Sequence, residues 1–152
     1  KDFGLAYAKS QISSGNSLPT KGLAFISLKD KHKNEGIDLA KKLVELNFTL
    51  CGTEGTANAI QKNGIKCKKI NKVSGGSPHI VDVLNAKKIA LVINTGGGKR
   101  AYRILDSTSL RRATLINKVP YCTNMSTAYA CLEGIKSLKS KKITVTSLQD
   151  IK

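Results

Sequence analysis

LCGTEGTANAI, residues 50–60, joins a short apolar run to a helix-like run through a Gly-Thr-x-Gly-Thr turn. Such a turn suits a strand-to-helix crossover, because glycine permits a tight corner and threonine can cap the first turn of a helix. The backbone N–H groups at a helix N-terminus can also cradle a phosphate. This stretch alone leaves both interpretations open, a plain corner and a phosphate cradle.

Strand-like and helix-like runs alternate on both sides of this turn. The strand-like runs are residues 22–28, 48–53, 65–70, 89–95 and 119–124, and the helix-like runs are 34–47, 54–64, 79–88, 99–117 and a stretch striped by Ala128, Cys131, Ile135 and Leu138. In the run 34–47, Ile37, Ala40, Leu43 and Val44 are predicted to share the apolar face. The alternation predicts an α/β fold, a parallel sheet with helices on both faces. Residues 142–148, KITVTSL, predict an additional C-terminal edge strand.

The first part of the chain has a different character. Residues 2–14 place Leu5, Ala8 and Ile12 at helical spacing, and GNSLPTKG, residues 15–22, has the composition of a linker. We therefore expect a terminal helix and linker from a preceding domain at 1–19 and the main domain at 20–152. A first residue that is Lys rather than Met fits a processed chain or an excised fragment.

The charge balance narrows the possible partners. Lysine and arginine number 26 against 10 acidic residues, a net charge of +16, which attracts nucleic acid, phosphorylated metabolites or an acidic protein face. Aromatic residues make up 5% and tryptophan is absent, which argues against a nucleic-acid binder. No apolar run is long enough for a membrane span. Four widely spaced cysteines and two histidines predict buried thiols in a reducing cytoplasm rather than a zinc site.

Polar residues follow nearly every predicted strand. The exits are Ser27; Thr53, Glu54, Gly55 and Thr56; Asn71, Lys72, Ser74, Gly75, Gly76 and Ser77; Asn94, Thr95, Gly96, Gly97 and Gly98; and Thr123, Asn124, Ser126 and Thr127. The carboxyl ends of parallel strands share one edge, where ligands bind. Any one exit could be an ordinary cap or turn, but five together favour an anion site, with Lys33, Lys72, Lys99 and Arg100 as countercharges.

The more specific motifs of nucleotide binding and nucleophilic catalysis are incomplete in this sequence. Gly96-x-Gly98-x-x-Ala101 follows the fourth strand rather than the first and lacks the later ribose-binding acid. Gly98-Lys99 lacks the rest of a P-loop, and GGSPH is no nucleophile elbow because His79 replaces the second glycine. Glu54 is the one acid at the exits, and His79 is predicted to begin a helix. Without an obvious acid–base pair, the edge favours a sensor over an enzyme.

Five segments occur in an order that resembles a known family. KGLAFISLKDKHK, TEGTA, INKVSGGSPHIVD, LVINT and DSTSLRRA are similar to segments of the methylglyoxal-synthase-like regulatory domain at the C-terminus of the carbamoyl phosphate synthetase large subunit. The similarity covers about residues 20–150. The resemblance implies a Rossmann-type three-layer fold with a five-stranded parallel sheet. It implies binding of nucleoside monophosphates at the strand exits, with UMP inhibiting and IMP activating in well-studied bacterial members.

The resemblance also assigns residues. It places Lys33, Thr53, Gly55, Thr56 and Lys72 around the phosphate, Asn94 and Thr95 beside the ligand, and Ser27 and Asp106 at further pocket positions. Tyr121 and Thr123 match residues that help hold ornithine between this domain and its neighbour. Gly96 stands where members often carry a hydroxyl, which puts the identity of the effector in question. Ser77 replaces the aspartate that methylglyoxal synthase uses, so we expect its lyase chemistry to be absent.

The leading hypothesis is therefore a cytoplasmic allosteric module that is not an enzyme on its own. It would regulate carbamoyl phosphate synthesis for pyrimidine and arginine production. The resemblance implies the rest of the large subunit, a glutaminase small subunit and an oligomeric holoenzyme as partners. It implies no cofactor or metal in this domain, with ATP, magnesium or manganese, and potassium confined to the rest of the subunit. The alternatives are a small enzyme acting on a phosphorylated substrate, of the methylglyoxal synthase or IMP cyclohydrolase type, and a basic nucleic-acid module.

Overall fold

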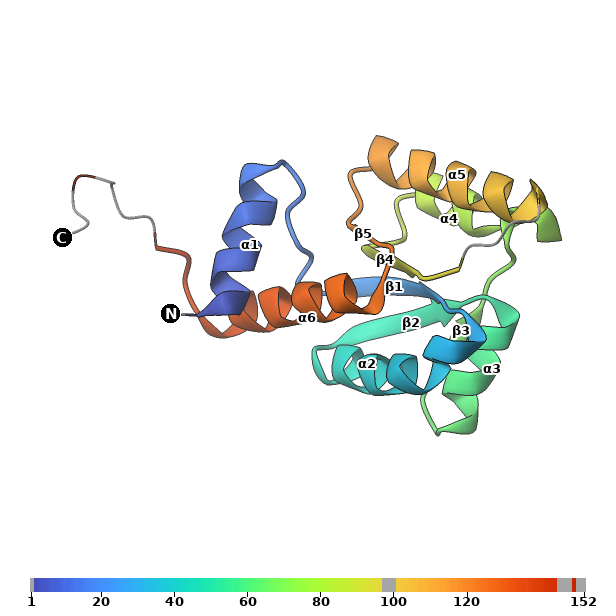
Figure 1. Ribbon diagram of the computed structural model, residues 1–152, viewed down its shortest axis with the longest axis horizontal. Helices are drawn as coiled ribbons and strands as arrows, with labels where there is room; N and C mark the ends of the chain where they lie inside the picture. The colour runs from blue at the N-terminus through green and yellow to red at the C-terminus, as the bar shows by residue number, and fades with distance from the viewer. Residues whose placement is uncertain (1, 97–100, 145–148, 150–152) are drawn as a thin grey trace.

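Five strands form one parallel sheet in the computed structural model, which describes residues 2–96, 101–144 and 149. The strands are β1 (Gly22–Ser27), β2 (Phe48–Gly52), β3 (Lys68–Lys69), β4 (Leu91–Asn94) and β5 (Tyr121–Cys122). Their order across the sheet is β3-β2-β1-β4-β5, and every neighbouring pair is parallel (Figure 1). The chain thus builds one side of β1 first and then crosses to the other. This reversal lies between β1 and β4, where such sheets leave a crevice at their carboxyl edge.

Helices cover both faces of the sheet, as predicted. They are α1 (Phe3–Ser13), α2 (Lys33–Glu45), α3 (Glu54–Lys62), α4 (Ile80–Asn85), α5 (Ala101–Ile116) and α6 (Met125–Ser140), with short 3-10 turns η1 (Asp30–His32) and η2 (Val73–Gly75). Helices α2, α3 and α6 pack on one face, and α4 and α5 on the other (Figure 1). The three-layer α/β architecture is therefore confirmed.

Alternation along the central strands divides the core between the two faces. Ile26 of β1 and Ile93 of β4 point toward α2, α3 and α6, while their neighbours Phe25 and Val92 point toward α4 and α5. All four are almost fully buried. Successive side chains of a strand face opposite sides, so an uninterrupted apolar run serves both layers at once.

Some sequence-based details change in the structure. Val44 is 44% exposed, and the buried face of α2 is formed by Gly36, Leu39, Ala40 and Leu43. β3 and β5 are two-residue strands, shorter than the apolar runs that predicted them. Residues 142–144 carry no strand, and the rest of the predicted edge strand, 145–148, lies outside the described residues.

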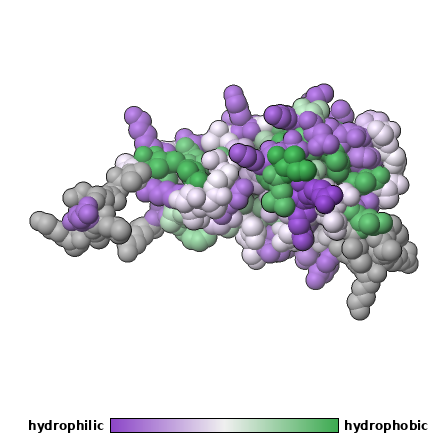
Figure 2. Space-filling view, turned by 90° about the horizontal axis from the view of Figure 1, so that it is seen from above, coloured by the Kyte–Doolittle hydropathy of each residue, from purple (hydrophilic) through white to green (hydrophobic). Residues whose placement is uncertain are grey.

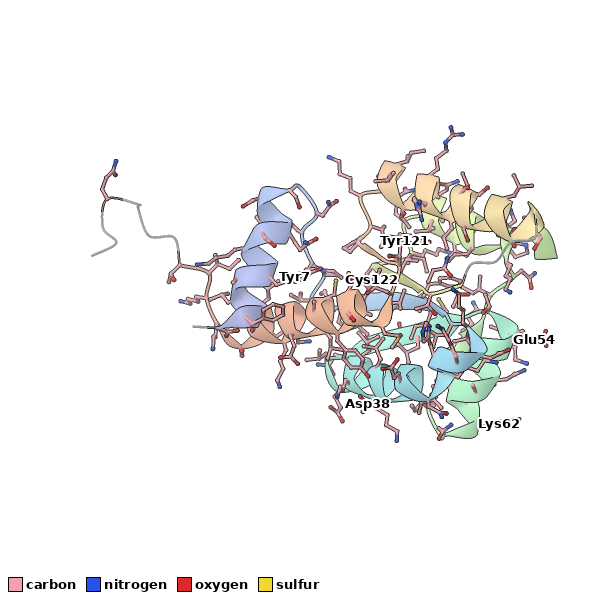
Figure 3. The ribbon with its side chains drawn as sticks, in the orientation of Figure 1. Tyr7, Asp38, Glu54, Lys62, Tyr121 and Cys122 are labelled. Carbon is pink, nitrogen blue, oxygen red and sulfur yellow. The ribbon has the colours of Figure 1, made fainter. Side chains whose placement is uncertain are left out.

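The N-terminal helix packs against α6, which it crosses at a steep angle (Figure 1). The Tyr7 hydroxyl lies 3.5 Å from Cys131 Sγ, which in turn lies 3.4 Å from Cys122 Sγ; Figure 3 labels Tyr7 on α1 and Cys122 at the end of β5. Leu18 of the predicted linker is buried in the core between the sheet and α2, α3 and α6, to which Cys122 and Cys131 also belong. The helix is therefore integrated with the sheet domain, and the domain boundary at residue 19 stays a prediction.

All four cysteines are buried free thiols. Burial raises the pKa of Cys51 to about 12 and that of Cys67 to about 11. A thiol that stays protonated is a poor nucleophile and a poor metal ligand, so these two side chains act as small core residues. No helix in the described part of the chain combines the length and apolar character needed to cross a membrane.

Candidate functional site

A cavity of about 390 Å³ opens at the carboxyl edge of the sheet. Its lining comprises Phe25, Ser27, Leu28, Lys29, Asp30, Lys33, Thr53, Gly55, Thr56, Lys72, Val73, Ile80, Asn94, Gly96, Asp106, Ser107 and Leu110. The walls come from the exits of β1, β2 and β4, the loop carrying Lys72, and α5. The cavity thus lies at the point where the strand order reverses, which is where ligands bind in sheets of this kind.

A cluster of three hydroxyls forms the inner wall. The Thr53 hydroxyl lies 3.4 Å from Ser27 Oγ and 3.3 Å from Thr56 Oγ1. Thr56 Oγ1 also accepts a hydrogen bond from the Leu28 N–H at 3.0 Å, which ties the exit of β2 to that of β1. Thr53 and Thr56 are buried, so their rotamers are held by packing. Preorganised hydroxyls of this kind suit the oxygen atoms of an anion.

The N-terminus of α3 points into the same wall. Thr53 is the N-cap residue, and among the described residues no side chain caps this helix end. The first-turn N–H groups, including those of Gly55 and Thr56, carry the positive end of the helix dipole. A Cβ on Gly52 would lie 2.6 Å from the Ile26 carbonyl oxygen, so this glycine allows β2 to pass close to β1. The two glycines of the turn therefore have different roles: Gly52 serves strand packing, and Gly55 lies at the cavity.

Three lysines supply positive charge to the cavity: Lys29, Lys33 and Lys72. The Lys33 ammonium is 2.6 Å from the Asp30 carboxylate, an i,i+3 ion pair at the start of α2. Lys72 is exposed at the cap of η2. The combination of lysine ammonium groups with buried hydroxyls and helix N–H groups matches the requirements of a phosphate monoester.

The Asn94 side chain holds the backbone that follows β4 in place. Its Oδ1 accepts from the Gly96 N–H at 3.0 Å, and its Nδ2 donates to the Tyr121 hydroxyl at 3.0 Å. A Cβ on Gly96 would lie 2.8 Å from Asn94 Oδ1, so a side chain there would displace the amide. Thr95 is also buried, but its Oγ1 accepts from the Lys29 N–H at 3.1 Å and braces the wall from behind.

The opposite wall carries a carboxylate. Asp106 of α5 accepts two hydrogen bonds from Ser74, from the backbone N–H at 3.0 Å and from the hydroxyl at 2.7 Å. These bonds join the turn that follows Lys72 to α5. Val73, Ile80 and Leu110 add apolar surface to this side of the cavity. The cavity is thus cationic and hydroxyl-rich at one wall and mixed at the other, as a ligand with both a phosphate and an organic part requires.

The structure brings most of the predicted effector residues together. Ser27, Lys33, Thr53, Gly55, Thr56, Lys72, Asn94 and Asp106 line the cavity, and Thr95 supports it. Tyr121 reaches it through Asn94, whereas Thr123 is exposed and does not line it. Lys99 and Arg100 lie outside the described residues. Sequence reasoning missed Lys29, Ser107 and Leu110, although helical spacing from Asp106 could have found Leu110, four residues further along α5.

The segment after β3 holds a Ser, a His and an Asp in a structural arrangement. Asp82 Oδ2 accepts from Ser77 Oγ and from the His79 N–H, each at 2.8 Å. These two bonds, with that from His79 the larger, hold the pKa of Asp82 below its usual range. The carboxylate thus caps the start of α4, as the prediction that His79 begins a helix implied. In the part of the chain that is described, no group of three or more His, Cys, Asp or Glu side chains is arranged to hold a metal ion.

Comparison with known proteins defines the class. The profile of the MGS-like domain family matches residues 35–123, more than half of the chain. The fold is similar to that of methylglyoxal synthase from Elizabethkingia anophelis NUHP1, with a TM-score of 0.57 and 18% identity over 76% of this chain and 79% of that one. The chain therefore belongs to the MGS-like domain family, as the sequence motifs indicated.

Relatives at higher identity narrow the comparison. The chain is 43% identical over 150 residues to the carbamoyl phosphate synthase large chain of Mesorhizobium japonicum. It is 43% and 44% identical to the C-terminal sections of the large chains of Methanopyrus kandleri and Aquifex aeolicus. Each match covers 99% of this chain but only 13%, 28% and 29% of the respective relative. The chain is thus similar to the C-terminal section of these large chains, and spans a small part of them.

Proposed function

We propose that this chain is the effector-binding domain of a carbamoyl phosphate synthase large chain and binds nucleoside monophosphates of the UMP or IMP type. The observation that carries the proposal is the convergence of Thr53, Thr56, Lys33 and Lys72 on one cavity at the start of α3. Fixed hydroxyls and helix N–H groups would hold the phosphate oxygens, and the lysines would neutralise their charge. The apolar side chains Val73, Ile80 and Leu110 would contact the organic part of the ligand.

Regulation would follow from differential binding. A ligand shifts a conformational equilibrium only as far as its affinities for the two states differ. In this proposal the domain contacts the rest of the large chain, the occupied cavity favours one arrangement of that contact, and carbamoyl phosphate synthesis for pyrimidine and arginine production changes. The small subunit, an oligomeric holoenzyme and a cytoplasmic location belong to the same proposal. Cofactors would bind elsewhere in the large chain.

Ornithine contact is a further part of this proposal. The Arg111 guanidinium lies over the Tyr121 ring, 5.9 Å from the ring centroid, and the Tyr121 hydroxyl accepts a hydrogen bond from Asn94 Nδ2. An amino acid bound beside Tyr121 would therefore be one hydrogen bond away from the nucleotide cavity. Thr123 is exposed on the same exit and would complete the contact only together with the neighbouring domain.

Titration calorimetry with UMP and with IMP tests the proposal. The 152-residue chain should bind at least one of the two, and Lys72→Ala should weaken that binding by about tenfold or more, because it removes a charge-assisted contact to phosphate. Lys88→Ala is the matched control: it removes the same charge from an exposed position outside the cavity and should change the affinity by less than about twofold. A wild-type chain that ignores both nucleotides would overturn the proposal.

The competing enzyme hypothesis predicts turnover of a phosphorylated substrate. General acid–base catalysis needs a titratable group within reach of the ligand. Ser77, His79 and Asp82 are engaged with one another at the start of α4, and none of the three lines the cavity. The two acids that do line the cavity are engaged as well, Asp30 with Lys33 and Asp106 with Ser74, so the arrangement favours binding without turnover. Conversion of dihydroxyacetone phosphate that Ser77→Ala abolishes would favour the enzyme instead.

A further inference from the structure

Ser74 and Asp106, which are 32 residues apart in sequence, connect the loop after β3 to α5 at the cavity. Ser74 lies in η2, two residues after Lys72, and Asp106 lies in the second turn of α5. The Ser74 N–H and hydroxyl donate to the two oxygens of one carboxylate, at 3.0 and 2.7 Å. The Gly75 N–H donates to the Lys72 carbonyl at 2.9 Å and closes the turn that carries Lys72 and Ser74. The paired bonds therefore fix the carboxylate relative to the loop that carries Lys72.

The position of this carboxylate in the cavity is chemically informative. A phosphate is repelled by a carboxylate, so it will occupy the wall opposite Asp106, where Lys29, Lys33, the hydroxyls and the α3 N-terminus lie. The Asp30 carboxylate on that wall is already paired with Lys33. Each carboxylate oxygen has two lone pairs, and Ser74 uses one on each. The remaining lone pairs face the cavity lining and can accept from water or from a bound ligand, and the hydroxyl groups of a sugar are the donors that a nucleotide places nearest to its phosphate.

We propose that Ser74 is a positioning residue that holds the Asp106 carboxylate toward the hydroxyl-bearing part of the bound nucleotide. The proposal rests on the proposed function and deepens it, because it concerns the discrimination between a phosphorylated sugar and phosphate alone. A bidentate hydrogen bond leaves the acceptor little freedom to rotate, and preorganisation of this kind lowers the entropy cost of binding. Ser74 is exposed, so the two bonds it makes to Asp106 are the contacts through which it acts.

A merely structural role makes a different prediction. If Ser74 only fastened η2 to α5, its loss would loosen the loop carrying Lys72, and every phosphate-bearing ligand would lose affinity alike. If Ser74 positions Asp106, ligands without hydroxyl groups should be unaffected. The ratio of the affinity for a ligand with sugar hydroxyls to the affinity for phosphate alone therefore distinguishes the two roles of Ser74.

The experiment compares UMP, ribose 5-phosphate and inorganic phosphate on four proteins. UMP and ribose 5-phosphate are titrated by calorimetry, and inorganic phosphate is measured by its competition with UMP. Ser74→Ala should weaken the binding of UMP and ribose 5-phosphate by about three- to tenfold, the effect of one hydrogen bond to a charged group at a partly exposed site. Binding of inorganic phosphate should change by less than about twofold. Ser74→Thr, which keeps the hydroxyl, should restore the wild-type ratio.

The fourth protein is the control Ser140→Ala. The Ser140 hydroxyl bonds only to carbonyls of its own helix, those of Lys136 and Ser137, far along α6 from the cavity. This variant should behave as the wild type with all three ligands. Thermal melts of all variants establish that they are folded. If Ser74→Ala does not fold, Asp106→Asn keeps the shape of the acceptor and should reduce the same affinity ratio.

The outcomes separate this proposal from the proposed function. Equal losses for phosphate and UMP would assign Ser74 a structural role and overturn the inference, as would an unchanged UMP affinity in Ser74→Ala. In both cases UMP still binds the wild type, so the proposed function survives. A wild type that binds neither nucleotide would overturn both together.

Discussion

At the scale of single residues, Lys33 has the Asp30 carboxylate as its anionic partner, and a bound phosphate would compete with it. Its ammonium is 2.6 Å from the Asp30 carboxylate, although the Asp30 side chain is 94% exposed. A phosphate in the cavity would need the same ammonium group. Because the pair is near the surface, the attraction that must be exchanged is modest, and a ligand held by further groups can displace it.

Asp30→Asn should therefore strengthen nucleotide binding, by about two- to fivefold, since it removes the charge that competes for Lys33. Calorimetry with UMP measures the change. Asp38→Asn is the matched control, because Asp38 pairs with Lys42 at 2.9 Å within α2 but does not line the cavity. A weaker UMP affinity in Asp30→Asn would show instead that the carboxylate helps to hold the ligand.

At the scale of elements, α1 is held to α6 by polar contacts of its N-cap residue Asp2 and by close packing of its first turn. Asp2 caps α1 by accepting from the Leu5 N–H at 3.1 Å, and it also accepts from Ser137 at 3.1 Å and pairs with Lys141. Gly4 allows the close approach, because a Cβ there would lie 2.4 Å from the Glu133 carbonyl oxygen. A helix that sequence reasoning assigned to a preceding domain is thus fastened at its first turn.

These contacts predict a dependence of stability on pH. The Lys141 pairing and the Leu5 N–H lower the pKa of Asp2 from its ordinary 3.8 to about 2. A carboxyl group whose pKa is lower in the folded than in the unfolded state stabilises the folded state at pH values above its unfolded-state pKa. This stabilisation is lost as the pH falls from about 4 to 2. Thermal unfolding of the wild type and of Asp2→Asn should therefore differ at pH 6 and converge near pH 2. A gap of constant size would contradict the assignment.

Gly4→Ala provides the contrast for that experiment. Its added methyl group collides with α6 at every pH, so the loss of stability should be the same at pH 6 and near pH 2. Convergence in Asp2→Asn together with a constant gap in Gly4→Ala would separate the charge contribution from packing.

The elements themselves were predictable because their patterns are local. Apolar runs predicted the strands, and the polar residues that follow them predicted the edge at which the cavity lies. Two-residue strands such as β3 were overestimated in length, since an apolar run does not show where a neighbour stops pairing. Thr95 could have been assigned to the back of the wall, because a residue next to Asn94 on an extended chain faces the other way.

The Ser74–Asp106 pair was beyond sequence reasoning for a different reason. Each residue was named separately, Ser74 at a strand exit and Asp106 as a pocket position, but their contact depends on how η2 packs against α5 across 32 residues. The hydrogen bond from Asn94 to Tyr121 is of the same kind, because it joins the exits of two neighbouring strands. Contacts of this sort follow from packing, which a single sequence does not display.

At the scale of the whole molecule, the net charge of +16 far exceeds what one phosphate needs. Figure 2 views the molecule from the side of α5 and shows hydrophilic side chains projecting between apolar patches. The exposed large apolar side chains of α5 are Leu105, Leu115 and Ile116 among the described residues. A general positive field would attract any anion, nucleic acid included, and would weaken with salt. A local site would depend on the few lysines at the cavity.

Substitutions of two lysines at opposite edges of the sheet distinguish the general positive field from the local site. Lys29 lines the cavity, whereas Lys88 precedes β4 at the other end of the strand; both are exposed. Both Lys29→Gln and Lys88→Gln lower the net charge equally. Lys29→Gln should weaken UMP binding by about three- to tenfold at about 20 mM salt, where the Debye length is roughly 20 Å, and by less than about twofold at 0.5 M. Lys88→Gln should stay within about twofold at both. Equal effects of the two variants would mean that the summed field of the protein, and not the cavity, sets its affinity for nucleotides.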